Sequence, residues 1–195
     1  MYISDQYQIQ WWLPPRTASR MTKSIITKLG FKTHRGHHSV FSDCEYDVYL
    51  NIRNPYGIVA SIFHMKDPDT FISFEDYVIR NQGWFGNPEN DYTMDFVDAI
   101  IKQNSSVKKL IRYENYRDDI LSIDFIQENI HLLQEEMKDM NLGNQLWRQQ
   151  THLWHKRIPY NQLYTQETAD IVYELKKKFF EFGGYEKDSW KTLTE

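Results

Sequence analysis

Strand signals alternate with helix signals in the first part of the chain, and this alternation constrains the fold more than any other feature. The apolar run 9–14 and the Val- and Tyr-rich run 46–55 each predict a strand. Each leads into a segment whose apolar residues have helical spacing, 19–29 and 55–65, and a third strand is predicted at 107–116. Strands that alternate with helices predict an α/β fold with a central, mainly parallel sheet flanked by helices.

Further helices are predicted outside this alternating region. Short helices are expected near 74–80 and 91–103, and a long helix is expected at 166–181. Apolar residues that step by four and three predict one amphipathic helix, whose apolar face carries Ile126, Ile130, Leu133, Met137 and Met140. That face fits either the core of the protein or the seam of a homodimer.

Length and composition fit a single globular domain over residues 1–195, of which 41% are hydrophobic and 26% are charged. The formal net charge of −4 gives no general reason to expect a nucleic-acid partner, so any anion site must be local. No apolar run approaches the roughly 18 residues of a membrane span, and the N-terminus lacks the pattern of a signal peptide. We therefore expect a cytoplasmic protein without a membrane partner, and the lone Cys44 excludes an intramolecular disulfide.

The loop between the first predicted strand and its helix, PPRTASRMT (14–22), contains two arginines and three hydroxyl side chains but no carboxylate. The N-terminus of a helix carries unbonded N–H groups and partial positive charge, so anions bind there. The loop lacks the G-x-x-x-x-G-K-[ST] pattern of P-loop kinases, and the chain has no G-x-G-x-x-G dinucleotide motif. The residues indicate an anion site of neither kind.

Four stretches resemble, in the same order, motifs of the sulfotransferases that use 3′-phosphoadenosine 5′-phosphosulfate (PAPS). The loop at 14–22 resembles the family's 5′-phosphosulfate loop, and RNPYGIVAS (53–61) resembles its 3′-phosphate motif, R-[DN]-P-x-x-x-x-x-S. IRYENYRDDI (111–120) resembles a later strand and turn, and the ending at 163–191 resembles the closure of bacterial and carbohydrate-type members. The resemblance implies a three-layer P-loop NTPase-like fold. Residues 66–104 match least and are expected to form an insertion on the substrate side.

The resemblance also implies roles for individual residues. The 5′ end of the donor is implied to bind Arg16, Thr17, Ala18, Ser19, Arg20, Met21 and Thr22. Arg16 stands where the family has a basic residue on the 5′-phosphate, while Arg20 stands where many members have Thr or Ser. Ala18 replaces a frequent Gly, and its Cβ is compatible with this loop only if φ stays negative.

The resemblance implies that Arg53 and Ser61 bind the 3′-phosphate of the donor. The spacing is compatible with this role, since Arg53 ends a predicted strand and Ser61 lies two turns into the following helix. The alternative is that Arg53 forms an ordinary ion pair and that Ser61 faces the sheet. Arg157 is either a further phosphate contact or a plain surface residue.

The acceptor also needs a base, and the helix at 19–29 contains no carboxylate. The segment THRGHHSVF resembles the element that supplies a His base in the hexuronic-acid 2-O-sulfotransferases, so His37 or His38 is the expected base. The choice between the two stays open. No metal is expected, because the spacing of His34, His37, His38 and Cys44 matches no standard zinc signature.

The expected function is therefore that of an enzyme, a PAPS-dependent sulfotransferase that acts on a hydroxyl of a carbohydrate or small metabolite. Trp84 and Phe85 either stack on a sugar ring or pack locally. One alternative is a non-catalytic nucleotide-binding module of the same fold. Another is a P-loop-type small-molecule kinase, which the missing Gly-Lys pair disfavours. The identity of the acceptor and the oligomeric state are left open.

Overall fold

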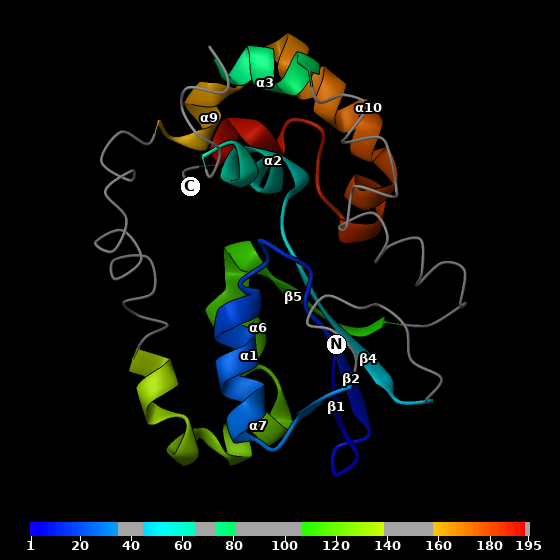
Figure 1. Ribbon diagram of the computed structural model, residues 1–195, viewed down its shortest axis with the longest axis vertical. Coiled ribbons are helices and arrows are strands. Elements are labelled where there is room, and N and C mark those ends of the chain that lie inside the picture. The colour runs from blue at the N-terminus through cyan, green and yellow to red at the C-terminus, as the bar shows by residue number, and fades with distance from the viewer. Residues whose placement is uncertain (35–44, 65–72, 81–106, 139–157, 194–195) are drawn as a thin grey trace. The chain divides into compact units, whose positions relative to one another are not determined.

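The computed structural model describes residues 1–34, 45–64, 73–80, 107–138 and 158–193, which form an α/β structure of one open sheet and several helices (Figure 1). The chain divides into two compact units. The first unit comprises Met1–Ile52 and Ala99–Lys156, and the second comprises Arg53–Asp98 and Arg157–Glu195. The sequence predicts a single domain over residues 1–195, and that these two units belong to one domain stays a prediction.

A mixed sheet of five strands forms part of the first unit, in the order β3-β1-β2-β4-β5. The strands are β1 (Tyr2–Ser4), β2 (Ile9–Trp12), β3 (Lys32–Thr33), β4 (Asp47–Ile52) and β5 (Val107–Arg112). β4 runs parallel to both β2 and β5, which confirms the three predicted strands in shortened form.

The two other pairings are antiparallel, because β1 pairs with both β2 and β3 in that sense. The expectation of a mainly parallel sheet is therefore too simple. The cause is a tight turn at residues 5–8, where Gln8 adopts a φ of 55° and the chain reverses into a hairpin.

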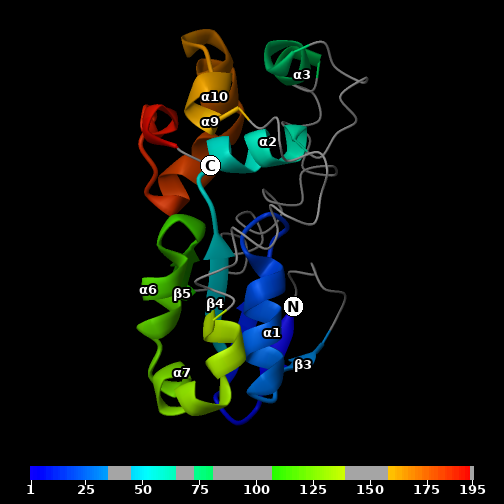
Figure 2. The same cartoon turned by 90° about the vertical axis from the view of Figure 1, so that its left-hand side faces the viewer.

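The helices of the first unit that the structure describes pack on one face of this sheet (Figures 1 and 2). They are α1 (Ser19–Lys28), α6 (Tyr116–Leu121) and α7 (Asp124–Glu128), with the short 3₁₀ helices η1 (Tyr113–Asn115) and η2 (Ile130–Leu132). Their apolar residues share a core with Ile9 and Trp11 of β2. Trp12 and Leu50, on the opposite face of the sheet, are also buried. The three-layer arrangement remains a prediction.

The amphipathic helix predicted for residues 126–140 is wrong as a single element. The chain leaves helical geometry at Asn129, where φ is −107°, and the Asn129 side chain donates to the Phe125 carbonyl at 2.8 Å. This local hydrogen bond competes with the helical ladder, as asparagine side chains often do. Ile126 and Leu133 are consequently buried, whereas Ile130 is 39% exposed.

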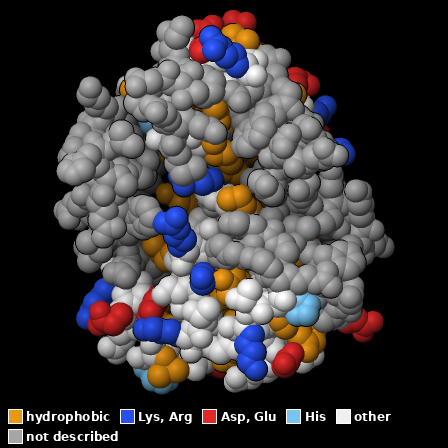
Figure 3. Space-filling view, viewed as in Figure 1, with side chains coloured by type: hydrophobic (Ala, Val, Ile, Leu, Met, Phe, Trp, Pro, Cys, Tyr) orange, Lys and Arg blue, Asp and Glu red, His pale blue; other side chains and the backbone are white. Residues whose placement is uncertain are grey.

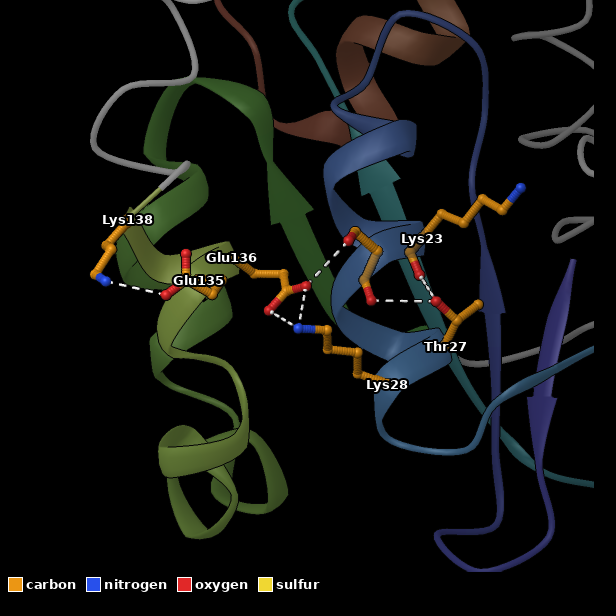
Figure 4. A network of polar contacts seen from close by, with 7 residues as sticks. Lys23, Thr27, Lys28, Glu135, Glu136 and Lys138 are labelled. Carbon is orange, nitrogen blue, oxygen red and sulfur yellow. Dashed lines mark hydrogen bonds and ion pairs between the residues drawn. The ribbon is translucent and has the colours of Figure 1, made fainter.

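A carboxylate from the segment after this break holds the C-terminal half of α1. Glu136 accepts hydrogen bonds from Lys28 Nζ at 2.8 Å and from Ser24 Oγ at 3.3 Å (Figure 4). Burial alone would raise the pKa of Glu136, but these hydrogen bonds outweigh it and lower the pKa. Glu136 therefore fixes the helix that follows the arginine-rich loop.

The second unit is helical in its described residues. α2 (Pro55–Phe63) contacts α3 (Phe74–Arg80), α9 (Tyr160–Leu163), α10 (Gln166–Gly183) and η4 (Ser189–Thr192). These elements confirm the helices predicted at 55–65, 74–80 and 166–181. The helix predicted at 91–103 lies outside the described residues.

Capping interactions at both ends of α10 determine where the helix begins and ends. Thr165 and Thr168 form a reciprocal capping box at the start. At the other end Gly184 takes a φ of 67°, and the Tyr185 N–H reaches back to the Phe180 carbonyl at 2.9 Å. Among the residues with described positions, no helix combines the length and apolar character that a membrane span requires.

Candidate functional site

The loop from β2 into α1, together with the first turn of α1 (residues 13–22), is here called the first corner. Arg16 has a φ of 68° and Ala18 a φ of 61°, both in the left-handed region. Such a conformation costs a residue with a Cβ about 1–2 kcal/mol. The condition of a negative φ, under which a Cβ at position 18 would be unstrained, is therefore not met, and the surrounding hydrogen bonds must hold the loop in this shape.

Asn51 of β4 makes several of the hydrogen bonds that stabilise this loop. Its side-chain Nδ2 donates to the Thr17 carbonyl at 2.8 Å and to Thr22 Oγ1 at 2.7 Å, and its Oδ1 accepts from Trp11 Nε1 at 2.8 Å. The orientation of the amide is settled by chemistry, because an indole N–H only donates and a carbonyl only accepts. Asn51 is fully buried, so each of these bonds is protected from water.

Hydrogen bonds within the fold occupy every donor and acceptor position of the Thr22 hydroxyl. It donates to the Ala18 carbonyl at 3.2 Å, accepts from Asn51, and lies 2.9 Å from the Tyr116 hydroxyl. Burial raises the pKa of Tyr116, more than the hydrogen bond to Thr22 lowers it, so the phenol keeps a proton to donate. These bonds occupy the one donor and both acceptor positions of a hydroxyl. Thr22 thus supports the loop.

Thr17 is similar, because its hydroxyl donates to the Pro14 carbonyl at 2.6 Å and its side chain is buried. The Ser19 hydroxyl, by contrast, makes no hydrogen bond to any residue whose position is described. Of the three hydroxyls assigned to phosphate binding, Ser19 is thus the one whose proton is not used within the described structure.

Ala18, the N-cap residue of α1, has no side chain that could cap the helix, and no side-chain cap comes from the part of the chain that the structure describes. The first backbone bond runs from the Thr22 N–H to the Ala18 carbonyl at 3.1 Å, so the N–H groups of Ser19, Arg20 and Met21 precede the helical ladder. The first turn contains no acidic residue, Arg16 is half-buried and Arg20 is exposed. Backbone N–H groups and guanidinium groups together can bind a strongly negative group here.

The positive charge at the first corner is local. Figure 3 shows one face of the molecule, where Asp and Glu side chains lie next to Lys and Arg side chains near the lower edge of the described surface. This mixture agrees with the formal net charge of −4.

The start of α2, residues 53–61, is here called the second corner, and it is built differently. Asn54 Oδ1 accepts from the Tyr56 N–H at 3.0 Å, and Asn54 Nδ2 donates to Ser189 Oγ at 2.8 Å. Pro55 occupies the first turn, where its missing N–H costs no helical bond. The N-terminus of α2 is therefore capped by its own chain.

Charge at the second corner comes from a side chain. Arg53 is only 5% exposed, and its guanidinium carbon lies 5.5 Å from the centre of the Tyr160 ring. Ser61 is 1% exposed. A guanidinium can bind a phosphate through two parallel hydrogen bonds, so this position is suited to an anionic ligand.

Two tyrosines fix α2 within the second unit. The Tyr164 hydroxyl donates to the Tyr56 carbonyl at 2.8 Å, and the Tyr56 hydroxyl donates to the Lys187 carbonyl at 2.7 Å. Burial raises the pKa of both phenols, so both remain donors at neutral pH. The helix that carries Ser61 is thereby held against α9 and the C-terminal segment.

The structure brings the predicted 5′ residues, Arg16 to Thr22, together at the first corner, and it places Arg53 and Ser61 on the second. His37, His38 and Arg157 lie outside the described residues, as do Trp84 and Phe85. Within the described ranges, no three His, Cys, Asp or Glu side chains form a group that could hold a metal ion.

Sequence reasoning missed Asn51, Tyr116, Gly57 and Tyr160. A polar Asn51 between the apolar Leu50 and Ile52 of a central strand was a usable signal, because buried asparagine needs hydrogen-bond partners. Gly57 inside the helix predicted at 55–65 was a second signal, because glycine is a poor helix former. Tyr116 and Tyr160 had no local signal, since their partners are set by tertiary contacts. Comparison of the chain with known protein families, characterised proteins and solved structures finds no match.

Proposed function

We propose that this chain is a PAPS-dependent sulfotransferase, with the three-layer P-loop-like fold, single domain and cytoplasmic location expected for it. The observation that carries the proposal is the first corner, where an uncapped helix begins at a left-handed Ala18 beside Arg16. Strained backbone at a loop rich in donors is characteristic of ligand-binding sites. The ordered match of the later motifs supports the same function.

The first corner would bind the 5′ end of the donor. In sulfuryl transfer the bond from sulfur to the bridging oxygen of the 5′-phosphate breaks, while the acceptor oxygen forms a new bond to sulfur. Negative charge grows on the bridging oxygen, and Arg16 with the N–H groups of Ser19 to Met21 would stabilise it. Thr17 and Thr22 would act by holding the loop.

The second corner would bind the 3′-phosphate, with Arg53 as the cation and Ser61 as a hydroxyl partner. His37 or His38 would accept the proton that the acceptor hydroxyl loses. The acceptor is proposed to be a carbohydrate or a small metabolite. No metal is part of the proposal.

Titration calorimetry with adenosine 3′,5′-bisphosphate and with AMP tests the proposal most directly. We expect the bisphosphate to bind at least about tenfold more tightly, since it alone gains a charge-assisted contact with Arg53. Equal binding of the two nucleotides would show that the assignment of Arg53 is wrong. Absence of any binding would reject the nucleotide site itself.

A radiolabelled-donor screen over glycans and small alcohols then tests catalysis. We expect His37→Ala or His38→Ala to abolish transfer while binding of the bisphosphate survives. Tight binding without transfer to any acceptor would favour the non-catalytic module. Transfer of phosphate from ATP would favour the kinase.

A further inference from the structure

Arg53 lies against the first turns of α2 in a way that depends on Gly57. A Cβ placed on Gly57 would be 2.9 Å from Arg53 Nε, 3.6 Å from Cζ and 3.7 Å from Cδ. Contacts of a Cβ below 3.0 Å essentially do not occur, so any larger residue at this position would displace the guanidinium. Glycine is otherwise a poor choice inside a helix.

Tyr160 limits Arg53 on another side. Its ring centre lies 5.5 Å from the guanidinium carbon, within the range of a cation–π contact. Tyr160 is 3% exposed, so little water screens this contact. His64 stacks on the same tyrosine with ring centres 5.5 Å apart and planes inclined by 22°, which fixes the orientation of the ring.

We propose that Gly57 and Tyr160 are positioning residues that set the specificity of the second corner for a nucleotide with a phosphate on its ribose. They do so by holding the Arg53 guanidinium in place before the ligand arrives. The inference rests on the proposed function, because that function supplies the phosphate that Arg53 binds. A preorganised fork loses less conformational freedom on binding and discriminates more sharply.

Gly57→Ala distinguishes this positioning role from an ordinary structural role. A structural role predicts lower thermal stability in the variant, whereas a positioning role predicts weaker binding without a loss of stability. Alanine favours a helix interior, so the variant should unfold at the same temperature as the unmutated chain or a higher one. The clashing atoms belong to the far part of a long side chain, which can move without disrupting the fold. We expect binding of the bisphosphate to weaken by about tenfold, with little change for AMP.

Tyr160 offers a matched pair of variants. Tyr160→Leu removes the ring and should weaken bisphosphate binding by about twofold to fivefold. Tyr160→Phe keeps the ring face and should leave binding unchanged. A similar loss in both variants would assign the effect to the hydroxyl and overturn the inference for Tyr160.

The experiment is titration calorimetry of the full chain and these three variants with adenosine 3′,5′-bisphosphate and with AMP, alongside thermal unfolding. A ratio of the two affinities that falls in Gly57→Ala and Tyr160→Leu, and holds in Tyr160→Phe, supports the inference. An unchanged ratio in Gly57→Ala or Tyr160→Leu, or equal losses for both nucleotides, overturns it while the proposed function stands. If the unmutated chain binds both nucleotides equally, the assignment of Arg53 fails and this inference fails with it, whereas absence of binding for both would reject the proposed function.

Discussion

The two strand-to-helix corners of this protein, each proposed to bind a phosphate, differ in where their positive charge comes from. At the first corner, α1 starts from a left-handed Ala18, which has no side chain that could cap the helix, so the proposed anion contacts are made by backbone N–H groups. At the second corner, Asn54 caps α2, and the charge comes from the buried side chain of Arg53. A backbone-built site recognises negative charge in general, whereas a fixed guanidinium recognises one particular group.

The two corners also differ in backbone strain, which the residues with a positive φ indicate. Arg16 and Ala18 adopt backbone conformations that each cost about 1–2 kcal/mol, and the bonds from Asn51 offset that cost. In the second corner neither Arg53 nor Asn54 has a positive φ. Strain is thus concentrated in the corner proposed to stabilise the transferring group.

The largest expected effect comes from applying one substitution to both corners. Asn51→Asp removes the two donors that hold Thr17 and Thr22 and places a carboxylate beside oxygen atoms. We expect the free energy of unfolding at pH 7 to fall by about 3 kcal/mol. Asn54→Asp keeps the acceptor that caps α2 and adds a favourable charge at a helix N-terminus, so its effect should stay within about 1 kcal/mol.

Urea denaturation of both variants measures this difference. The carboxyl introduced at position 51 should have a raised pKa, so the Asn51→Asp variant should regain part of its stability as pH falls. Equal losses at the two corners would mean that Asn51 is no more important than an ordinary cap.

Arginine substitutions sharpen the comparison for ligands. Arg53→Ala should cost about 2 kcal/mol of bisphosphate binding and little AMP binding, because AMP lacks the 3′-phosphate. Arg16→Ala should weaken both nucleotides alike, since both carry a 5′-phosphate. Calorimetry of the two variants decides, and a selective loss of the bisphosphate in Arg16→Ala would reverse the assignment of the corners.

Lys176 lies on α10, which contacts α2, and we expect it to make the stability of the second unit depend on pH. Burial lowers the pKa of Lys176 from 10.5 to about 7. Between these values the unfolded chain binds more protons, so stability should rise with pH across this range. Lys176→Met should remove that rise and raise the free energy of unfolding at pH 7 by about 1.4 kcal/mol or more.

The exposed neighbour provides the control for Lys176. Lys177→Met should change stability by less than about 0.5 kcal/mol and preserve the rise with pH. Denaturation curves at several pH values between neutral and alkaline make the comparison. The same slope in both variants would exclude Lys176 as its source.

The smallest effect tests the strain in the first corner. Ala18→Gly removes the steric cost of the left-handed conformation and should stabilise the chain by about 0.5–1 kcal/mol. Ala60→Gly, in the interior of α2, should destabilise it by about 1 kcal/mol. A higher stability of Ala18→Gly and a lower stability of Ala60→Gly would confirm that the backbone is strained at the first corner and not in α2. A loss of stability in both variants would contradict this difference.

Local signals account for the parts of the fold that the sequence predicted well. Pro55 at the start of α2 and Gly184 at the end of α10 act through their own backbone geometry, so the pattern located these helices to within a few residues. The prediction failed where a side chain overrode periodicity, as at Asn129, and where a hairpin added an antiparallel strand. The conformation of Ala18 was also missed, because its support comes from another strand.

By itself, the sequence determined the order of the three parallel strands and of α1, α2, α3 and α10, because periodicity, proline and glycine act over a few residues. It also placed Arg16 just after one predicted strand and Arg53 at the end of another. Only the tertiary structure decided that Thr22 is held by Asn51 and Tyr116, which lie 29 and 94 residues away along the chain. It likewise decided that Arg53 rests against Gly57 and Tyr160. Contacts of this kind depend on which distant side chains packing brings together, and no local pattern encodes that choice.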